Sequence, residues 1–275
     1  MMDLSGSSNS SPNKKQPIDL HVWRDPPAAG GWNMAADEAL ARQSEETNRV
    51  LMRLYGWLPH TVSLGSFQRC VDFSETLELS HWPVVRRPSG GGAIIHGTDL
   101  TYGLAVPGSH DWSRGTEKLY AAVHGALVEE LGGRHLRARM VETTSRETDQ
   151  SFYCFNRRAF GDLVIEDASG TSPHGNHKIL GSAQRRLSGV VLQHGSLLLH
   201  KNPHIQGEGS HVGLGDVLQA GSGSVNDVVD GWLQRLADRL NGELIVETGP
   251  SYEKENGEIA RRTERYESVA WLHRR

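Results

Sequence analysis

The sequence predicts one domain of mixed α and β structure, an α+β fold with a mainly antiparallel sheet packed with helices. Many short segments alternate apolar and polar residues, as half-buried strands do. The stretch DASGTSPHGN at 167–176 has the turn-forming composition found at hairpin tips. The 275 residues show neither an internal repeat nor a clear linker after residue 17, so a single mixed domain is the simplest arrangement.

Nine segments are expected to form strands. The clearest is DLTYGLAVP at 99–107, where Leu100, Tyr102, Leu104 and Val106 share one face. The other expected strands cover residues 18–23, 51–57, 60–65, 82–87, 93–96, 162–166, 177–184 and 189–200.

Helical patterns occur in four places. Residues 33–46 are alanine-rich and predict a helix with Asn33 as its N-cap. Residues 116–133 carry the strongest helical pattern, and the closing glycine pair suits a C-cap. Residues 225–241 have an apolar stripe typical of an amphipathic helix. The charged residues near the end of the chain also follow a helical pattern, which defines a C-terminal helical extension at 246–275.

Composition and charge argue against several classes of function. The formal net charge of −4 argues against nucleic-acid binding, and no apolar run approaches the ~20 residues of a membrane span. Residues 1–17 are polar, lack the apolar centre of a secretory signal, and are expected to form a disordered tail. Only two cysteines occur, Cys70 and Cys154, which without an export signal predicts reduced thiols and a cytoplasmic protein.

Most short catalytic motifs are absent. The chain has no P-loop, no GxGxxG, no HExxH and no CxxC. His174 and His177 are the closest pair among fourteen histidines, and solvated loop histidines are favoured there over a metal site. No metal is therefore expected.

The segment RRPSGGGAIIH at 86–96 places three glycines directly before a predicted strand. Because each glycine costs backbone entropy, the run indicates that the backbone approaches something closely. The alternative is a bulge that only turns the strand. On the residues alone both interpretations stay open.

Several motifs together resemble the lipoate/biotin protein ligase and octanoyltransferase superfamily. RRPSGGGAIIH is similar to its RRxSGGGAVxH signature, GNHKILGSAQRR to its K-[IV]-x-G-[ST]-A-[QY] motif, and VLQHGSLLL to its HG[ST]LL strand. NMAADEAL and TVSLGSFQ also stand in the expected order. The resemblance implies the catalytic domain of that superfamily for residues 18–245.

One motif separates the branches of the superfamily. CFNRRAFGDLVIE at 154–166 resembles the pattern of octanoyltransferases that carry a cysteine just before this strand, whereas ATP-dependent lipoate ligases tend to have an Asn-Asp-Leu stretch without cysteine. HGTDLTYGLAVP and the tail RYESVAWLHRR are similar to the same transferase branch. Two features depart from it: Gly92 stands where these transferases favour arginine, and 167–176 lengthens a loop that should border the site.

The resemblance implies a cysteine and a lysine as catalytic residues. An acyl thioester is already activated, so its transfer to an amine needs a nucleophile and charge stabilisation but no ATP. Cys154 suits the first step, and because a free thiol has a pKa of ~8.5, a nearby cation raises its ionised fraction. Lys178 is the candidate cation and would also stabilise the oxyanion of each tetrahedral intermediate. A lone cysteine is otherwise more often a buried spectator, the role expected of Cys70.

An eight-carbon acyl chain needs a narrow apolar slot, whose burial contributes about 0.8 kcal/mol per methylene. Three glycines at its mouth would leave the slot open and turn bare N–H groups toward a carbonyl or phosphate. Both candidate histidines could instead be core residues bonded to backbone. The predicted substrate-binding residues are Arg87, Ser89, Gly90, Gly91, Gly92, His96, Gly181, Ala183, Gln184 and His194.

Three functions stay open. The first is octanoyl transfer from acyl carrier protein to a lysine of a lipoyl domain or the glycine-cleavage H protein, through a Cys154 thioester, by a monomer without cofactor. The second is an ATP-dependent lipoate-protein ligase, which would use ATP and Mg²⁺. The third is a non-catalytic acyl- or carrier-binding module, against which the presence of both Cys154 and Lys178 argues. Acidic partners would be attracted by a basic rim, unless its arginines are merely solvated: Arg157, Arg158, Arg185 and Arg186.

Overall fold

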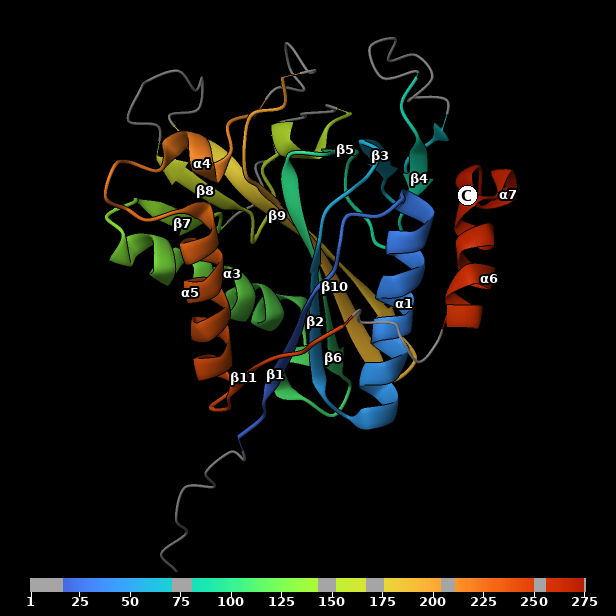
Figure 1. The fold of residues 1–275 in the computed structure, drawn as a ribbon, viewed down its shortest axis with the longest axis horizontal. Helices are drawn as coiled ribbons and strands as arrows, with labels where there is room; N and C mark the ends of the chain where they lie inside the picture. Colours follow the sequence, from blue (N-terminus) through green and yellow to red (C-terminus); the bar gives the residue numbers. More distant parts are fainter. Residues whose placement is uncertain are drawn as a thin grey trace, which may run out of the picture.

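The computed structural model describes residues 17–70, 81–142, 152–166, 176–203, 211–249 and 256–274. Its centre is an eight-stranded sheet in the order β11-β1-β2-β6-β10-β9-β8-β7 (Figure 1). Five neighbouring pairs are antiparallel and two, β1 with β2 and β1 with β11, are parallel. The strands are β1 (Leu20–Arg24), β2 (Val50–Tyr55), β6 (Asp99–Pro107), β7 (Ala138–Met140), β8 (Leu163–Glu166), β9 (Asn176–Leu187), β10 (Val190–Leu198) and β11 (Leu244–Val246).

A second, three-stranded sheet has the order β4-β3-β5, with β3 parallel to β4 and antiparallel to β5. Its strands are β3 (Thr61–Leu64), β4 (Val84–Arg86) and β5 (Ile94–His96). The glycine run therefore connects β4 to β5, and β5 leads almost directly into the long central strand β6. The predicted α+β class with a mainly antiparallel sheet is confirmed.

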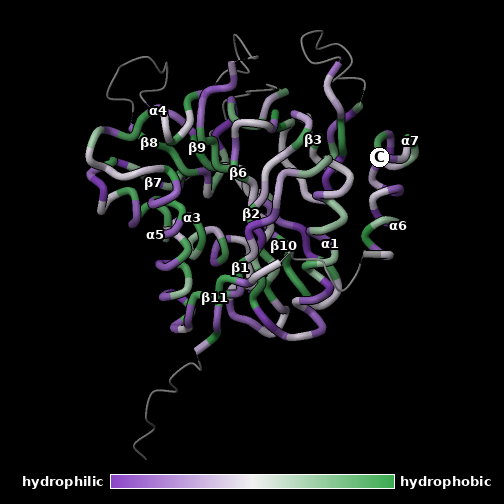
Figure 2. Tube along the Cα trace, viewed as in Figure 1, coloured by the Kyte–Doolittle hydropathy of each residue, from purple (hydrophilic) through white to green (hydrophobic). Residues whose placement is uncertain are grey.

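Helices cover both faces of the large sheet. On one face, α3 (Thr116–Gly133) and α5 (Val225–Arg239) pack on the main core, which includes Tyr102, Leu104 and Val106 as the alternation in β6 predicts. Hydrophobic and hydrophilic residues alternate along α5 in Figure 2, as expected of an amphipathic helix. On the other face, α1 (Gly30–Thr47) packs through Leu40 and Ala41 against residues of β2, β6 and β10.

The C-terminal helices α6 (Asn256–Glu267) and α7 (Val269–Leu272) pack outside α1 and reach β4 (Figure 1). Trp271 donates its indole N–H to the carbonyl of Arg86 at 2.9 Å, and the Arg86 side chain donates to the carbonyl of Leu272 at 2.7 Å. These two bonds tie the C-terminal helices to the residue at which the glycine-rich segment begins.

One predicted helix start and one predicted cap are wrong. Asn33 is not an N-cap: α1 begins at Gly30, and its N-cap is Ala29. A Cβ at Gly30 would lie only 3.0 Å from side chains of the small sheet, an approach that glycine allows. The Asn33 amide instead donates to two backbone carbonyls, those of Ala28 and Gly56. The glycine pair after residue 131 still belongs to α3, whose C-cap is Arg134.

Two edge strands, β7 and β11, were not predicted, because three residues are too few to show an alternation. The predicted tail falls almost wholly on residues that lie outside the described ranges, as do residues 167–175 of the inserted loop. Within the described part of the chain, no helix is long and apolar enough to cross a bilayer.

Candidate active site

Cys154 begins a single 3₁₀ turn, η3 (Cys154–Asn156), which is attached to the end of the glycine run. The Ala93 N–H donates to the carbonyl of Phe152 at 3.1 Å, and the Cys154 N–H donates to the carbonyl of Ala93 at 2.8 Å. A Cβ on Gly92 would lie 3.0 Å from both N and Cα of Cys154. Position 92 is therefore glycine because the backbone of the cysteine packs directly against it.

Lys178 lies near the start of β9, and its side chain is buried beside the cysteine turn. Its ammonium is 2.7 Å from a carboxylate oxygen of Asp162, 3.0 Å from the carbonyl of Cys154 and 3.3 Å from that of Arg157. The same nitrogen lies 3.8 Å from the Cys154 sulfur. Because oxygen acceptors already surround the three N–H bonds, the ammonium acts on the sulfur mainly through its charge.

Two neighbours fix the position of the ammonium. A Cβ on Gly181 would come within 2.9 Å of the Lys178 side chain, so glycine leaves room for it. The Ala159 N–H donates to the Asp162 carboxylate at 2.7 Å, which orients this carboxylate toward the lysine. Burial raises the pKa of Asp162, although the ammonium acts in the opposite direction.

His124 of α3 contacts the segment before β8 and strand β9, the two elements that carry Asp162 and Lys178. It is fully buried, and burial lowers its pKa to about 4, so the imidazole is neutral at pH 7. Its Nδ1–H donates to the carbonyl of Gly161, next to Asp162, and its Nε2 accepts a bond at 2.7 Å from the hydroxyl of Ser182. This neutral histidine therefore holds the segment that carries Asp162 against β9.

A pocket of about 430 Å³, part of it open to solvent, lies next to the cysteine. Its more exposed end is formed by Gly91, Cys154, Ser182 and Ala183. Its buried end includes the side chains of Met34, Tyr55, Trp57 and Thr101. A hydrophobic chain attached to the sulfur can therefore extend inward from the exposed end toward the large buried side chains.

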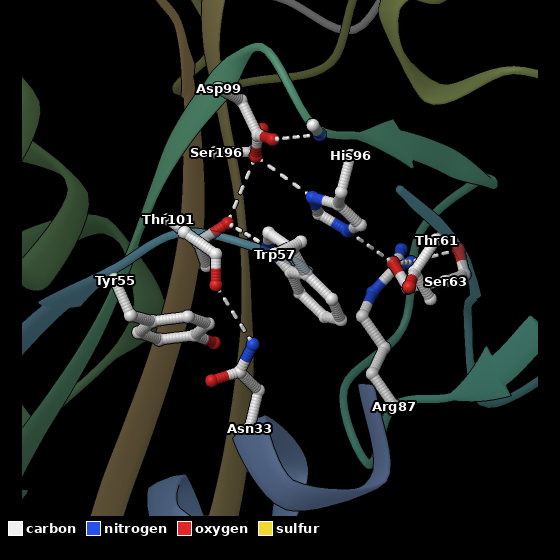
Figure 3. A network of polar contacts seen from close by, with 12 residues as sticks. Asn33, Tyr55, Trp57, Thr61, Ser63, Arg87, His96, Asp99, Thr101 and Ser196 are labelled. Carbon is white, nitrogen blue, oxygen red and sulfur yellow. Dashed lines mark hydrogen bonds and ion pairs between the residues drawn. The ribbon is translucent and has the colours of Figure 1, made fainter. Parts of the chain in front are cut away.

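A polar network fixes the inner wall of this pocket (Figure 3). Asp99 accepts bonds from His96 at 2.8 Å, from Thr101 at 2.9 Å and from Ser196 at 2.7 Å. The His96 ring stacks on Trp57 with a centroid distance of 3.9 Å, and Thr101 accepts the Trp57 indole N–H at 2.8 Å. The tryptophan is held from two directions, so the end of the pocket has a defined shape.

Arg87 places a buried positive charge beside the mouth. Its guanidinium donates to the carbonyls of Ser63, Gly90 and Gly92 at 2.7–2.8 Å. Among the described residues, these and its other hydrogen-bond acceptors are uncharged oxygens. Burial lowers the pKa of Arg87 to about 10, which still leaves it charged at pH 7. The site therefore contains a cation that favours an anionic group in the pocket.

His194 of β10 belongs to a second buried network. Its Nε2 lies 2.9 Å from the Asp37 carboxylate and its Nδ1 accepts a bond from the Ser89 hydroxyl at 3.1 Å. Burial alone would raise the pKa of Asp37, but His194 and Arg53, 2.9 Å away, hold it below its usual value. Asp37 stays ionised and fixes the imidazole that lines the pocket.

The structure separates the predicted substrate-binding residues into two groups. Those that line the pocket are Arg87, Gly91, His96, Gly181, Ala183 and His194. Ser89, Gly90 and Gly92 do not line it; Ser89 supports His194, Gly92 accommodates the cysteine turn, and Gly90 faces Phe67. Gln184 is directed elsewhere, because its amide donates to the carbonyl of Thr116 and to Gln193.

The predicted basic rim is divided. Arg157 and Arg158 adjoin the cysteine turn and are half-buried, whereas Arg185 and Arg186 are exposed further along β9. His174 lies outside the described residues, and within the described ranges no group of three metal-ligating side chains could hold an ion. Cys70 is partly buried and packs beside the small sheet.

Sequence reasoning missed Asp162, which directly precedes β8, and Asp37, which lies in α1. Asp162 stands inside the quoted CF segment and Asp37 inside NMAADEAL, and in both cases an acidic residue amid apolar ones was the available signal. The pattern at 51–57 predicts a strand, and nothing in it indicates that Tyr55 and Trp57 close a pocket.

The family model of the lipoyl protein ligase A/B catalytic domain matches residues 30–208, and the chain belongs to this family. Among similar proteins, octanoyltransferase LipM of Kyrpidia tusciae is 37% identical over 196 residues, which is 64% of each chain. Octanoyltransferase LipM of Bacillus subtilis is 33% identical over 183 residues, 62% of each chain. The matches thus span less than two thirds of these curated relatives.

Solved structures share the fold over most of their length. A chain from the archaeal lipoylation system of Thermoplasma acidophilum, a bi-partite lipoate protein ligase with its E2 lipoyl domain, matches with a TM-score of 0.68 at 19% identity, covering 93% of this chain and 96% of that one. A lipoate-protein ligase A bound with ATP matches with a TM-score of 0.65 at 20% identity, covering 94% and 99%. At these identities the likeness establishes the fold alone.

Proposed function

We propose that this protein transfers an octanoyl group from a thioester donor to a protein lysine through an acyl-Cys154 intermediate. The observation that carries the proposal is the Lys178 ammonium 3.8 Å from the Cys154 sulfur, at the open end of a buried pocket. The octanoyltransferases at 33–37% identity support the same chemistry.

The first step is thioester exchange. The Cys154 thiolate, stabilised by the nearby ammonium, adds to the acyl carbonyl and gives a tetrahedral oxyanion. The intermediate collapses, the bond from carbon to the donor sulfur breaks, and the donor thiolate leaves and takes up a proton. Lys178 and the guanidinium of Arg87 supply positive charge throughout this step.

In the second step the neutral amine of a protein lysine attacks acyl-Cys154. The carbon–nitrogen bond forms, the carbon–sulfur bond breaks, the amine nitrogen releases a proton to solvent, and the sulfur returns to the thiolate. Neither step needs ATP, because the energy of the thioester drives amide formation. We therefore propose that the reaction requires no cofactor.

The pocket explains how the acyl chain would be held. Its inner end is buried and closed by Trp57, Tyr55 and Met34, each no more than 5% exposed. Burying the six methylenes of an octanoyl chain would contribute about 5 kcal/mol. The chain would therefore lie inward while its carbonyl remains at the sulfur.

We propose acyl carrier protein as the donor and a lipoyl domain or the glycine-cleavage H protein as the acceptor, with this chain acting as a monomer. Arg157 and Arg158, beside the cysteine turn, would attract an acidic carrier. The Thermoplasma acidophilum system, in which a ligase of this fold is described with an E2 lipoyl domain, supports such an acceptor.

The test is incubation with octanoyl-acyl carrier protein in the absence of ATP, followed by intact mass before and after hydroxylamine. We expect an octanoyl adduct that hydroxylamine removes and that is missing in Cys154→Ser. Cys70→Ser is the matched control, because Cys70 is the second free and partly buried cysteine, and it should keep the adduct.

Two other results would replace this function. Product formed only with ATP and free lipoate, and undiminished in Cys154→Ser, would indicate the ligase reaction. Absence of both adduct and turnover would leave a non-catalytic acyl- or carrier-binding module.

A further inference from the structure

A second pocket of about 380 Å³, part of it open to solvent, lies beside the cysteine turn. Its apolar wall is formed by Ala93, Ile95, Phe155 and Leu198. Its polar groups belong to Thr98, Tyr153, His200, Asn202 and His211. None of the residues assigned above to the acyl-binding pocket lines it.

The two pockets lie on opposite sides of a wall that contains Cys154. Along the strand that includes β5, Ile94 and His96 face the acyl pocket, whereas Ala93 and Ile95 face the second pocket, as alternation in a strand requires. Across from it, Cys154 faces the acyl pocket while both of its chain neighbours, Tyr153 and Phe155, line the second one. Cys154 also packs in the cluster of Ile94, Phe155 and Leu198 that separates the two cavities.

This placement matters for the proposed reaction, because the carbonyl of a thioester carries two groups, the acyl chain and the thiol arm of the donor. When the acyl chain occupies the first pocket and its carbonyl meets the Cys154 sulfur, the thiol arm of the donor must leave on another side. The second pocket begins at the residues flanking that sulfur. A flexible thiol arm that leaves the sulfur through the open mouth of the acyl pocket can bend over the cysteine turn into this second pocket, because both pockets are partly open to solvent.

The lining of the second pocket indicates the chemistry of its ligand. His211 presents an Nε2 atom that is buried and has no hydrogen-bond partner in the described residues. Burial and the nearby cations Arg158 and Lys178 lower the pKa of His211 to about 4, so the imidazole is neutral at pH 7. A neutral nitrogen together with the Thr98 hydroxyl suits the N–H and C=O groups of amides, while the apolar wall suits the methylenes between them.

We propose that this second pocket binds the amide-bearing pantetheine arm of the acyl donor, separately from the acyl chain. The proposal rests on the function proposed above and adds a binding site for the leaving group. The arm stays in place while the carbon–sulfur bond to it breaks, and then departs as the free thiol. The recognition element is the arm itself, which is present on every pantetheine-linked carrier.

The test compares two small octanoyl thioesters, octanoyl-pantetheine and S-ethyl thiooctanoate, whose ethyl group is too short to enter the second pocket. The rate of acyl-Cys154 formation is measured by intact mass for each donor. We expect the wild type to prefer the pantetheine donor at least tenfold, since several hydrogen bonds and apolar contacts are gained. Thr98→Phe should fill the second pocket and bring the ratio of the two acylation rates close to one.

Two further variants complete the design. His211→Ala should lower the rate with octanoyl-pantetheine about fivefold, as expected for one hydrogen bond, and leave the ethyl thioester unchanged. Ser109→Phe is the matched control, because Ser109 lines an unrelated pocket near Trp112, and both rates should stay at the wild-type value.

The outcomes distinguish the two proposals. Equal rates with both donors in the wild type, or a preference that survives in both Thr98→Phe and His211→Ala, would overturn the arm-binding site while leaving the transferase intact. Binding of ATP that Thr98→Phe abolishes, without any discrimination between donors, would make the pocket a nucleotide site and overturn it as well. Failure of every donor to form acyl-Cys154 would instead overturn the proposed function.

Discussion

Replacing Lys178 by methionine removes the positive charge next to the sulfur while keeping a side chain of similar length. The Nζ–Sγ distance is 3.8 Å, and with an effective dielectric constant of about 20 a unit charge pair at that separation interacts by about 4 kcal/mol. If all of this energy stabilises the thiolate and the oxyanion, acyl-Cys154 formation should slow about a thousandfold. The assay is the rate of adduct formation by intact mass at saturating octanoyl donor.

The same substitution also breaks a buried ion pair. In Lys178→Met the Asp162 carboxylate loses the cation that it contacts. An uncompensated buried charge of this kind typically lowers the free energy of unfolding by about 3–5 kcal/mol. The double variant Lys178→Met/Asp162→Asn removes both charges and should recover much of that stability in urea denaturation. Its acylation rate should remain as low as that of the single variant.

This combination separates charge from folding. A single variant that keeps more than a tenth of the wild-type rate would refute the electrostatic role assigned to Lys178. Recovery of the rate in the double variant would also refute it, because the loss would then have come from the unpaired aspartate.

Three further predictions concern the glycine run, acid stability and the C-terminal helices. Gly92→Ala should slow acylation at least tenfold, since its Cβ would press on the cysteine backbone at 3.0 Å, whereas Gly90→Ala, whose Cβ meets only Phe67 at 3.7 Å, should keep the wild-type rate. From pH 7 to pH 5 the free energy of unfolding should fall by about 2 kcal/mol more in the wild type than in His124→Gln. The reason is that the unfolded histidine (pKa 6.5) takes up a proton over this range, whereas the folded one (pKa about 4) does not. An equal fall in both proteins, measured by urea denaturation at the two pH values, would contradict this. Trp271→Phe, which removes one bond to the backbone of β4, should lower the unfolding free energy by about 1 kcal/mol, and an unchanged denaturation midpoint would show that the bond contributes nothing.

Local sequence patterns predicted most of the fold because its long elements satisfy local rules. The strand expected at 99–107 is β6, and the helix expected at 116–133 is α3, with identical bounds. Patterns failed where tertiary contacts decide the outcome. α1 begins at Gly30, which packs closely against the small sheet, and no window of sequence around Asn33 contains that contact.

For the site, the sequence predicted the two candidate catalytic residues but not the contacts that hold them. The motifs located Cys154 and Lys178, and the structure brings them together across the turn and β9. They did not show that the three glycines serve different contacts, because Gly92 meets the cysteine turn and Gly90 meets Phe67 only in three dimensions. The carboxylate that holds the lysine, Asp162, likewise depended on the pairing of β8 with β9.

The wall between the two pockets makes the length of one short segment critical. Ile94 and His96 point to one cavity and Ala93 and Ile95 to the other, so inserting or deleting a single residue here would exchange the two sets. His96 would leave Asp99, and the apolar residues that bound one cavity would enter its neighbour. Evolution can therefore vary the identities of these side chains one at a time, but an insertion or deletion of one residue at this place would disrupt both cavities at once.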